Sequence, residues 1–189
     1  MHSTDHPEGK HCDTVEYLKQ HSLVVVTAES CTAGLIASRL AATPGAGEVL
    51  ESAFVVYDPK AKQRQLGVPA ELMEKYNLTS EPVALAMARG ALRNSDANLA
   101  IANTGVADDC DPEVEPGTQC YAWVFKIPRE EGGQGGEEKC GNGDGDGVQA
   151  FAETRVFKGT RNQVREASAD YALQRIAHYH RQAMGAGAQ

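Results

Sequence analysis

Residues 23–41 have the sequence LVVVTAESCTAGLIASRLA, in which an apolar run leads through a polar turn into a run of helix-forming residues. Residues 23–26 are typical of a strand that is buried on both faces of a sheet. Residues 33–41 place apolar side chains four residues apart on one face of a helix. We therefore expect a strand, a turn at residues 27–32 and a helix, which is the repeating unit of an α/β fold.

The rest of the chain continues this alternation. Short apolar runs bounded by Gly, Pro and Asp predict four further strands, and segments that open with Asp, Ser or Pro predict helices. The predicted strands lie at residues 52–57, 99–102, 121–127 and 149–157, and the predicted helices lie at residues 13–20, 59–65, just before 76, 80–90 and about 162–184. Since the last two strands would form a hairpin, the pattern predicts an α/β layered sandwich with a mixed, mostly parallel sheet.

The length and composition indicate one domain. The chain has 189 residues, of which 41% are hydrophobic, and this is enough for a full core. We expect a flexible N-terminal tail at residues 1–12 and a single domain at residues 13–184. Residues 129–147 contain eight glycines and six acids, so they predict a mobile hairpin insertion with little to bury.

Charge and residue spacing exclude several function classes. Eighteen Lys and Arg against 26 Asp and Glu give a net charge of -8, which disfavours nucleic acid and anionic membranes as partners. No apolar run approaches the roughly 20 residues that cross a bilayer, and the N-terminus does not resemble a signal peptide, so we expect a cytoplasmic protein. The five cysteines lack a regular zinc spacing, and residues 142–153 match a calcium loop only in part. We therefore expect reduced thiols and no bound metal ion.

Polar residues follow three of the predicted strands, at Ser30, Tyr57 and Thr104. Because ligands bind at the carboxyl ends of parallel strands, we expect these side chains to converge on one cleft. A nucleophilic serine needs a base, and a buried Lys62 would supply one because burial favours the neutral amine. It also needs an oxyanion site, which backbone N–H groups at the start of the helix after Thr32 would supply.

Simpler interpretations of these residues remain open. Ser30 would equally serve as a helix cap, Lys62 as a solvated helix charge and Tyr57 as an aromatic residue of a strand. Cys31 is an alternative nucleophile, since the dipole of the following helix would favour its thiolate.

Five segments of the chain resemble the CinA C-terminal family. They are AESCTAGLIASRL at 28–40, VVYDPKAKQRQLGVPAELM at 55–73, TSEPVALAMARGAL at 79–92, NTGVA at 103–107 and FKGTRNQVREASADYAL at 157–173. The resemblance covers about residues 13–183. It implies a three-layer α/β/α fold and hydrolysis of the carboxamide of nicotinamide mononucleotide to nicotinate mononucleotide and ammonia. It also implies a stand-alone enzyme with a small-molecule nucleotide as partner, no metal or organic cofactor, and self-association as a homo-oligomer.

The resemblance implies roles for individual residues as well. Ser30 would be the nucleophile, Lys62 its base, and Tyr57 a hydrogen-bonding partner that positions the serine or the substrate amide. Lys60 is the weaker candidate for the base. The other matched positions would contact the substrate: Cys31 and Thr32 beside the nucleophile, Thr104 and Gly105 at its border, Gly117 and Thr118 in the wall, and Arg161 and Arg165 at the phosphate.

The sequence departs from the family pattern in two places, at Ala33 and in the segment after Thr104-Gly105. Ala33 stands where the family commonly has glycine, a change that the start of a helix should tolerate. Where the family usually continues Thr-Gly-Ile-Ala-Gly-Pro, residues 104–112 have the sequence TGVADDCDP. Asp108, Asp109 and Asp111 would repel a phosphate dianion unless they point outward. Two alternatives therefore stay open: a catalytically silent member that binds a nucleotide or a protein partner, and an amidase for a less anionic substrate.

Overall fold

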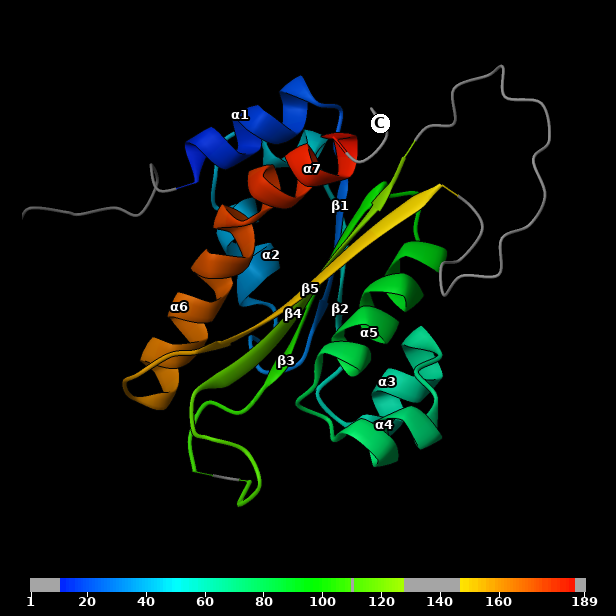
Figure 1. Cartoon of the computed structure of the whole chain (residues 1–189). Helices are drawn as coiled ribbons and strands as arrows, with labels where there is room; N and C mark the ends of the chain where they lie inside the picture. The colour runs from blue at the N-terminus through cyan, green and yellow to red at the C-terminus, as the bar shows by residue number, and fades with distance from the viewer. Residues whose placement is uncertain (1–10, 110, 128–146, 186–189) are drawn as a thin grey trace, which may run out of the picture.

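The computed structural model describes residues 11–109, 111–127 and 147–185, and it shows a sheet covered by helices on both faces (Figure 1). Residues 1–10 of the tail predicted at residues 1–12, and residues 129–146 of the insertion predicted at residues 129–147, lie outside the described residues. Within the part of the chain that is described, no helix is both long and apolar enough to cross a membrane.

The sheet contains five strands in the spatial order β2-β1-β3-β4-β5. β1 (Val25–Glu29) pairs in parallel with β2 (Leu50–Val55) and with β3 (Leu99–Gly105). β4 (Thr118–Lys126) pairs antiparallel with β3 and with β5 (Val148–Val156), so β4 alone runs against the direction of the other strands. The prediction of a mixed, mostly parallel sheet is therefore confirmed.

The helices form one layer on each face of the sheet (Figure 1). One layer contains α1 (Cys12–Gln20), α2 (Leu35–Ala41), α6 (Arg161–Gln174) and α7 (Ile176–Gly185). The other contains α3 (Pro59–Leu66), α4 (Ala70–Tyr76) and α5 (Glu81–Arg93). A short 3-10 segment, η2 (Ala46–Glu48), leads into β2. Because successive strand residues point to opposite faces, the sheet contributes to two cores, and the chain forms a three-layer α/β/α sandwich.

β1 lies between the other two parallel strands and is buried along its whole length. The apolar run predicts this strand at residues 23–26, whereas the structure places it at Val25–Glu29. Two polar residues are buried in it, and they satisfy each other: Thr27 Oγ1 donates a hydrogen bond of 3.0 Å to the Glu29 carboxylate. The strand thus reaches the residue directly before Ser30.

The C-terminal helix is divided, although the periodicity predicts one helix over about residues 162–184. α6 ends at Gln174, and α7 begins at Ile176. In a continuous helix the Ala172 carbonyl would accept the N–H of Ile176. Here it accepts the indole N–H of Trp123 in β4 at 3.0 Å, so a side chain from the sheet interrupts the helical ladder.

The N-terminal boundary of the domain lies before the predicted one. α1 begins at Cys12 after His11, whereas the pattern predicts this helix at residues 13–20. His11 is buried, and its Nε2 lies 3.1 Å from a carboxylate oxygen of Asp170. His11 and Cys12 therefore belong to the packed domain and not to a tail.

Candidate active site

The carboxyl ends of β1, β2 and β3 lie at one edge of the sheet, because these strands are parallel. Ser30 follows β1 directly, and its N–H donates to the Asn103 carbonyl of β3 at 2.9 Å. The Val56 N–H donates to the Glu29 carbonyl at 2.9 Å, so the hydrogen-bond ladder continues past the strand ends on both sides. The backbone around Ser30 is therefore held by both neighbouring strands.

Lys62 is brought to this edge by α3, whose start is specified by the local sequence. Asp58 caps the helix, since its carboxylate accepts the Lys60 N–H at 2.8 Å, and Pro59 occupies the first turn. Lys60 is exposed, whereas Lys62, two residues later and so on nearly the opposite face of the helix, is only 1% exposed. Of the two lysines considered from the sequence, only Lys62 is buried.

The Lys62 amine is surrounded by three oxygen atoms. Its Nζ lies 3.0 Å from Ser30 Oγ, 3.0 Å from the Val56 carbonyl oxygen and 3.1 Å from the Tyr57 carbonyl oxygen. The two carbonyls can only accept, so a neutral amine donates its two N–H groups to them. Its lone pair is then left to accept the proton of the Ser30 hydroxyl.

Burial shifts the protonation equilibrium of Lys62 in the direction that this role requires. Desolvation lowers the Lys62 pKa from 10.5 to about 8, and the nearby Asp58 carboxylate opposes the shift by favouring the charged form. At pH 7 the shift raises the neutral fraction of the amine from about 0.03% to about 9%. The amine is thus available as a base near neutral pH.

Glu29 organises the turn that carries Ser30, although no role for it is predicted from the sequence. Its carboxylate is fully buried and accepts the N–H groups of Gly34 at 2.8 Å, Ile36 at 3.1 Å and Ala37 at 2.9 Å. A carboxylate at the start of a helix is also favoured by the helix dipole. Glu29 therefore engages three of the N–H groups at which the sequence predicts an oxyanion site, those of Gly34, Ile36 and Ala37.

The turn also contains residues with left-handed backbone. Ala33 has φ 49° and Gly34 has φ 92°, and α2 begins only at Leu35. Ala33 was expected at the start of the helix, where alanine is favourable. It lies instead in a conformation that suits glycine and costs an L-residue about 1–2 kcal/mol.

A network of buried polar side chains holds the turn after β1 in place. The Thr32 N–H donates to Asn103 Oδ1 at 3.1 Å, and Asn103 Nδ2 donates to Gln119 Oε1 at 3.0 Å. Gln119 Nε2 donates to the Val106 carbonyl at 2.9 Å. Thr32, Asn103 and Gln119 are all fully buried. Thr32, assigned to substrate binding from the sequence, is here part of the support of the turn.

Cys31, next to Ser30 in the chain, packs in a small apolar cluster. It is 3% exposed and packs with Ala107 and Val164, and its sulfur accepts a hydrogen bond of 3.4 Å from Gln119 Nε2. Its carbonyl accepts the Nε–H of Arg165 at 2.9 Å. The structure therefore places this thiol in a buried apolar cluster.

Three side chains meet at this edge of the sheet: Tyr57 after β2, Asp108 after β3 and Arg161 at the start of α6. Arg161, the first residue of α6, donates from Nη1 to both carboxylate oxygens of Asp108 at 2.9 Å and from Nη2 to the Tyr57 hydroxyl oxygen at 2.8 Å. Tyr57 is 55% exposed and lies beyond the end of β2, so its backbone carbonyl contacts Lys62 while its phenol contacts Arg161. Arg165 lies deeper and donates from Nη2 to the Thr32 carbonyl at 3.2 Å.

The remaining predicted substrate residues shape the loop after β3. Thr104 is 2% exposed, and its hydroxyl donates to the Leu78 carbonyl at 2.8 Å. Gly105 has no room for a Cβ beside the Thr118 carbonyl, and Gly117 has φ 87° and lies against the Phe157 carbonyl. The Thr118 hydroxyl donates to the Glu115 carbonyl at 2.6 Å. These four residues hold the backbone of the wall in place.

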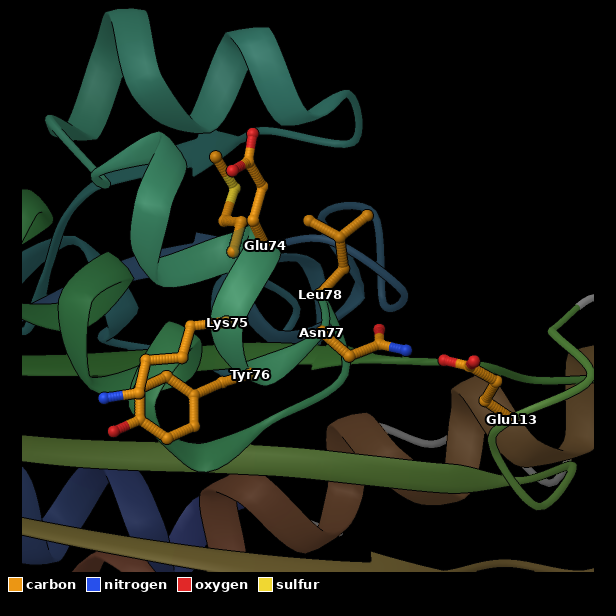
Figure 2. A pocket seen from close by; sticks show the side chains of 7 residues that line it. Glu74, Lys75, Tyr76, Asn77, Leu78 and Glu113 are labelled. Carbon is orange, nitrogen blue, oxygen red and sulfur yellow. The ribbon is translucent and has the colours of Figure 1, made fainter.

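A hollow of about 620 Å³ lies beside this wall, lined by Met73 to Leu78 and by Glu113 (Figure 2). Leu78 connects it to the end of β3 through the bond from Thr104. Figure 2 shows the Asn77 and Glu113 side chains pointing toward one another from the α4–α5 connection and from the loop after β3. The hollow therefore lies next to the carboxyl end of β3, on the side of α4.

No metal site is formed by the described residues. Across residues 11–109, 111–127 and 147–185, no group of three or more His, Cys, Asp or Glu side chains is arranged to hold a metal ion. Glu153 is the last residue of the segment that partly matches a calcium loop. Its carboxylate accepts hydrogen bonds of 2.6 Å from the hydroxyl groups of Tyr171 and Tyr179. The rest of that spacing, up to residue 146, lies outside the described residues.

The chain is similar to proteins of one family. A family model for the CinA C-terminal domain matches residues 9–134, more than half of the chain. A CinA-like protein of Akkermansia muciniphila is 46% identical over 112 residues, which cover 58% of this chain and 27% of that relative. The nicotinamide-nucleotide amidohydrolase PncC of Pseudomonas putida is 36% identical over 160 residues, which cover 84% of this chain and 87% of that relative.

The fold also matches solved structures. The crystal structure of a competence-damaged protein (CinA) superfamily protein from Escherichia coli has a TM-score of 0.75 at 28% identity, and the match covers 94% of this chain and 92% of that chain. The chain spans only 26% to 36% of the length of the CinA-like and competence-damage inducible relatives that it matches.

Proposed function

Since the chain belongs to the CinA C-terminal domain family, we propose that it is an amidohydrolase that deamidates nicotinamide mononucleotide to nicotinate mononucleotide and ammonia. The observation that carries this proposal is the buried contact of 3.0 Å between Lys62 Nζ and Ser30 Oγ. The name of the Pseudomonas putida relative supports the substrate class.

The proposed reaction uses Ser30 as nucleophile and Lys62 as general base. Neutral Lys62 takes the proton of the Ser30 hydroxyl while Oγ forms a bond to the carbonyl carbon of the carboxamide. The tetrahedral intermediate collapses when the C–N bond breaks, and Lys62 returns the proton to the departing nitrogen, which leaves as ammonia. This step leaves the nicotinate group as an ester on Ser30.

Water then completes the cycle. Lys62, neutral again, takes a proton from a water molecule whose oxygen attacks the ester carbon, and the Ser30 oxygen leaves with the proton that Lys62 returns. The product is the free carboxylic acid, and the enzyme is regenerated. Nucleophile and base are both side chains of the chain, so the proposed steps need no metal or organic cofactor.

The surrounding residues would position the substrate. Tyr57 and Arg161 lie at the open rim and would border the ribose and phosphate of the nucleotide. Arg165, which binds the carbonyls of Cys31 and Thr32, would hold the turn rather than the phosphate. The residues of the wall, Thr104, Gly105, Gly117 and Thr118, would set the shape of the cleft against which the nucleotide lies.

Ammonia release from nicotinamide mononucleotide by the purified protein tests the proposal. Ser30→Ala and Lys62→Met should each lose almost all turnover while circular dichroism shows an unchanged fold. Cys31→Ala is the matched control, since it changes the neighbouring nucleophilic side chain and should retain turnover. Absence of ammonia from the folded wild-type protein would instead favour a silent binding member, and full activity of Ser30→Ala would refute the assignment of the nucleophile.

A further inference from the structure

We propose that the chain has a second ligand site, separate from the Ser30–Lys62 pair, which binds a small organic phosphomonoester of the size of a mononucleotide. The site is a cavity of about 480 Å³ between the end of α5 and the paired ends of β4 and β5. Pockets that hold small molecules have volumes of about 300–1,000 Å³. The proposal concerns binding alone, so it does not depend on the proposed function.

The cavity lies at the opposite edge of the sheet from Ser30. Lys126, the last residue of β4, donates its backbone N–H to the Asn98 carbonyl at 2.9 Å, directly before β3 begins. The Ser30 N–H donates to Asn103, near the carboxyl end of β3. Residues 98 and 103 are about 16 Å apart in an extended strand, so the cavity is distinct from the candidate active site.

Three basic side chains from two elements line the cavity. Arg89 and Arg93 are four residues apart on α5 and so lie on one face of that helix, and Lys126 comes from β4. No acid is found among the described residues that line the cavity. The cavity therefore carries positive charge, although the net charge of the chain is -8.

Two of these cations have no acidic partner within the described ranges. Lys126 is exposed, and its Nζ forms no hydrogen bond or ion pair with another described residue. Arg93 donates from Nη2 to the Leu66 carbonyl at 3.4 Å and pairs with no described acid. A basic residue in the last turn of a helix complements the helix dipole, which accounts for Arg93 but not for Lys126 on a strand. An anion in the cavity would pair with both.

Ser95, which follows α5, adds a hydroxyl group to the same wall. Its Oγ is shielded from solvent and has no hydrogen-bond partner among the residues that the structure describes. Buried hydroxyl groups are nearly always hydrogen-bonded, so this one indicates the place of an acceptor oxygen from a ligand. A phosphomonoester supplies such oxygens, and its double negative charge suits a cavity with more than one cation.

The rest of the wall is apolar, which favours an organic phosphate over inorganic phosphate. Val124 lies on the same face of β4 as Lys126, and Val148 of β5 pairs with Lys126 across the two strands. Leu92 of α5 lines the cavity from the side of the helix. An aliphatic or aromatic group of the ligand would be removed from water between these side chains, which stabilises binding.

Isothermal titration calorimetry with adenosine monophosphate at low salt tests the proposal. Adenosine and inorganic phosphate should each bind at least about tenfold more weakly, because each lacks one of the two parts that the cavity recognises. The double variant Arg93→Gln with Lys126→Gln should lower the affinity for the monophosphate by about tenfold or more, and high salt should weaken the wild-type binding. The control Arg64→Gln with Arg181→Gln removes two exposed charges away from the cavity and should leave the affinity within about twofold.

Ser95→Ala tests the hydroxyl by itself. It should weaken the monophosphate about three- to tenfold and leave the melting temperature of the ligand-free protein unchanged, because the hydroxyl has no described partner to lose.

Four results would overturn the inference. They are no binding of the monophosphate by the folded wild type, adenosine or phosphate binding as tightly as the monophosphate, an unchanged affinity in the Arg93 and Lys126 double variant, and an equal loss in the control. An unchanged affinity in that double variant would place the bound nucleotide at the Ser30 edge instead. Ammonia release enters none of these measurements, so a failure of the proposed function leaves the test intact.

Discussion

Replacing Asp58 with Asn should shift the pH dependence of amide hydrolysis to lower pH. The Asp58 carboxylate favours the charged form of Lys62 and so opposes the effect of burial on the Lys62 pKa. Asparagine is as good a helix cap as aspartate, so the substitution keeps the bond to the Lys60 N–H and removes only the charge. The amine should therefore lose its proton more easily in the variant.

The size of the effect follows from the neutral fraction of Lys62. With a pKa of about 8, about 9% of the amine is neutral at pH 7. Loss of one nearby carboxylate is expected to lower that pKa by about 0.5–1 unit, which raises the neutral fraction to about 24–50%. Turnover at pH 7 should therefore rise about three- to fivefold, and turnover above about pH 10 should not change.

The assay is kcat/KM for the amide substrate between pH 6 and pH 10.5, fitted for the pKa of the essential base. Glu71→Gln, which removes a carboxylate from an exposed position of α4, is the control and should leave this pKa unchanged. Thermal melting checks that the α3 cap survives in Asp58→Asn. An identical or higher kinetic pKa in Asp58→Asn would refute the reasoning that neutral Lys62 is the base.

Three further predictions concern stability. The Lys62 pKa is about 8 in the folded chain and 10.5 in the unfolded chain, so between these pH values the unfolded chain binds more protons. The free energy of unfolding of the wild type should therefore rise from pH 8 to pH 10.5, by up to about 3 kcal/mol. Lys62→Met should therefore be more stable than wild type at pH 7 in urea melts, and its advantage should shrink toward pH 10.5; an advantage that does not depend on pH would contradict this. Glu29→Ala leaves the N–H groups of Gly34, Ile36 and Ala37 without their acceptor and should lower the free energy of unfolding by about 3 kcal/mol or more. Glu48→Ala, which removes an exposed ion pair with Lys19, should lower it by less than about 1 kcal/mol. Equal melting temperatures for these two variants would argue against a structural role of Glu29. Gly117→Ala should lower the free energy of unfolding by more than about 2 kcal/mol, because Gly117 has φ 87° and the Phe157 carbonyl occupies the space of a Cβ. Gly47→Ala, where a Cβ would meet open space, should change it by no more than about 0.5 kcal/mol.

The contact between Ser30 and Lys62 could be expected from the sequence, because the strand before Ser30 and the helix that carries Lys62 are each marked by residues next to them in the chain. The apolar run before Ser30 indicates a central strand, and Asp58-Pro59 marks the start of the helix that carries Lys62. Parallel strands bring their carboxyl ends to one edge, which explains how residues 32 positions apart come into contact.

Other features depend on contacts between distant segments and have no local signature. A glutamate within a strand is expected at the surface, yet Glu29 is buried because the start of α2 supplies its donors. The break in the C-terminal helix depends on Trp123 of β4, and the pairing of Asp108 with Arg161 joins residues 53 positions apart. An acid between an apolar strand and a helix start is the one signal that would have pointed to Glu29, since acids are favoured there.

The identity of the nucleophile is most directly tested by trapping the covalent intermediate. The protein is mixed with the amide substrate, quenched in acid within one turnover, digested, and analysed by mass spectrometry. The account predicts an ester of the nicotinate group on the peptide that contains Ser30, at the serine oxygen, and no adduct in Ser30→Ala. A thioester on Cys31, or ammonia release at the wild-type rate by Ser30→Ala, would contradict it.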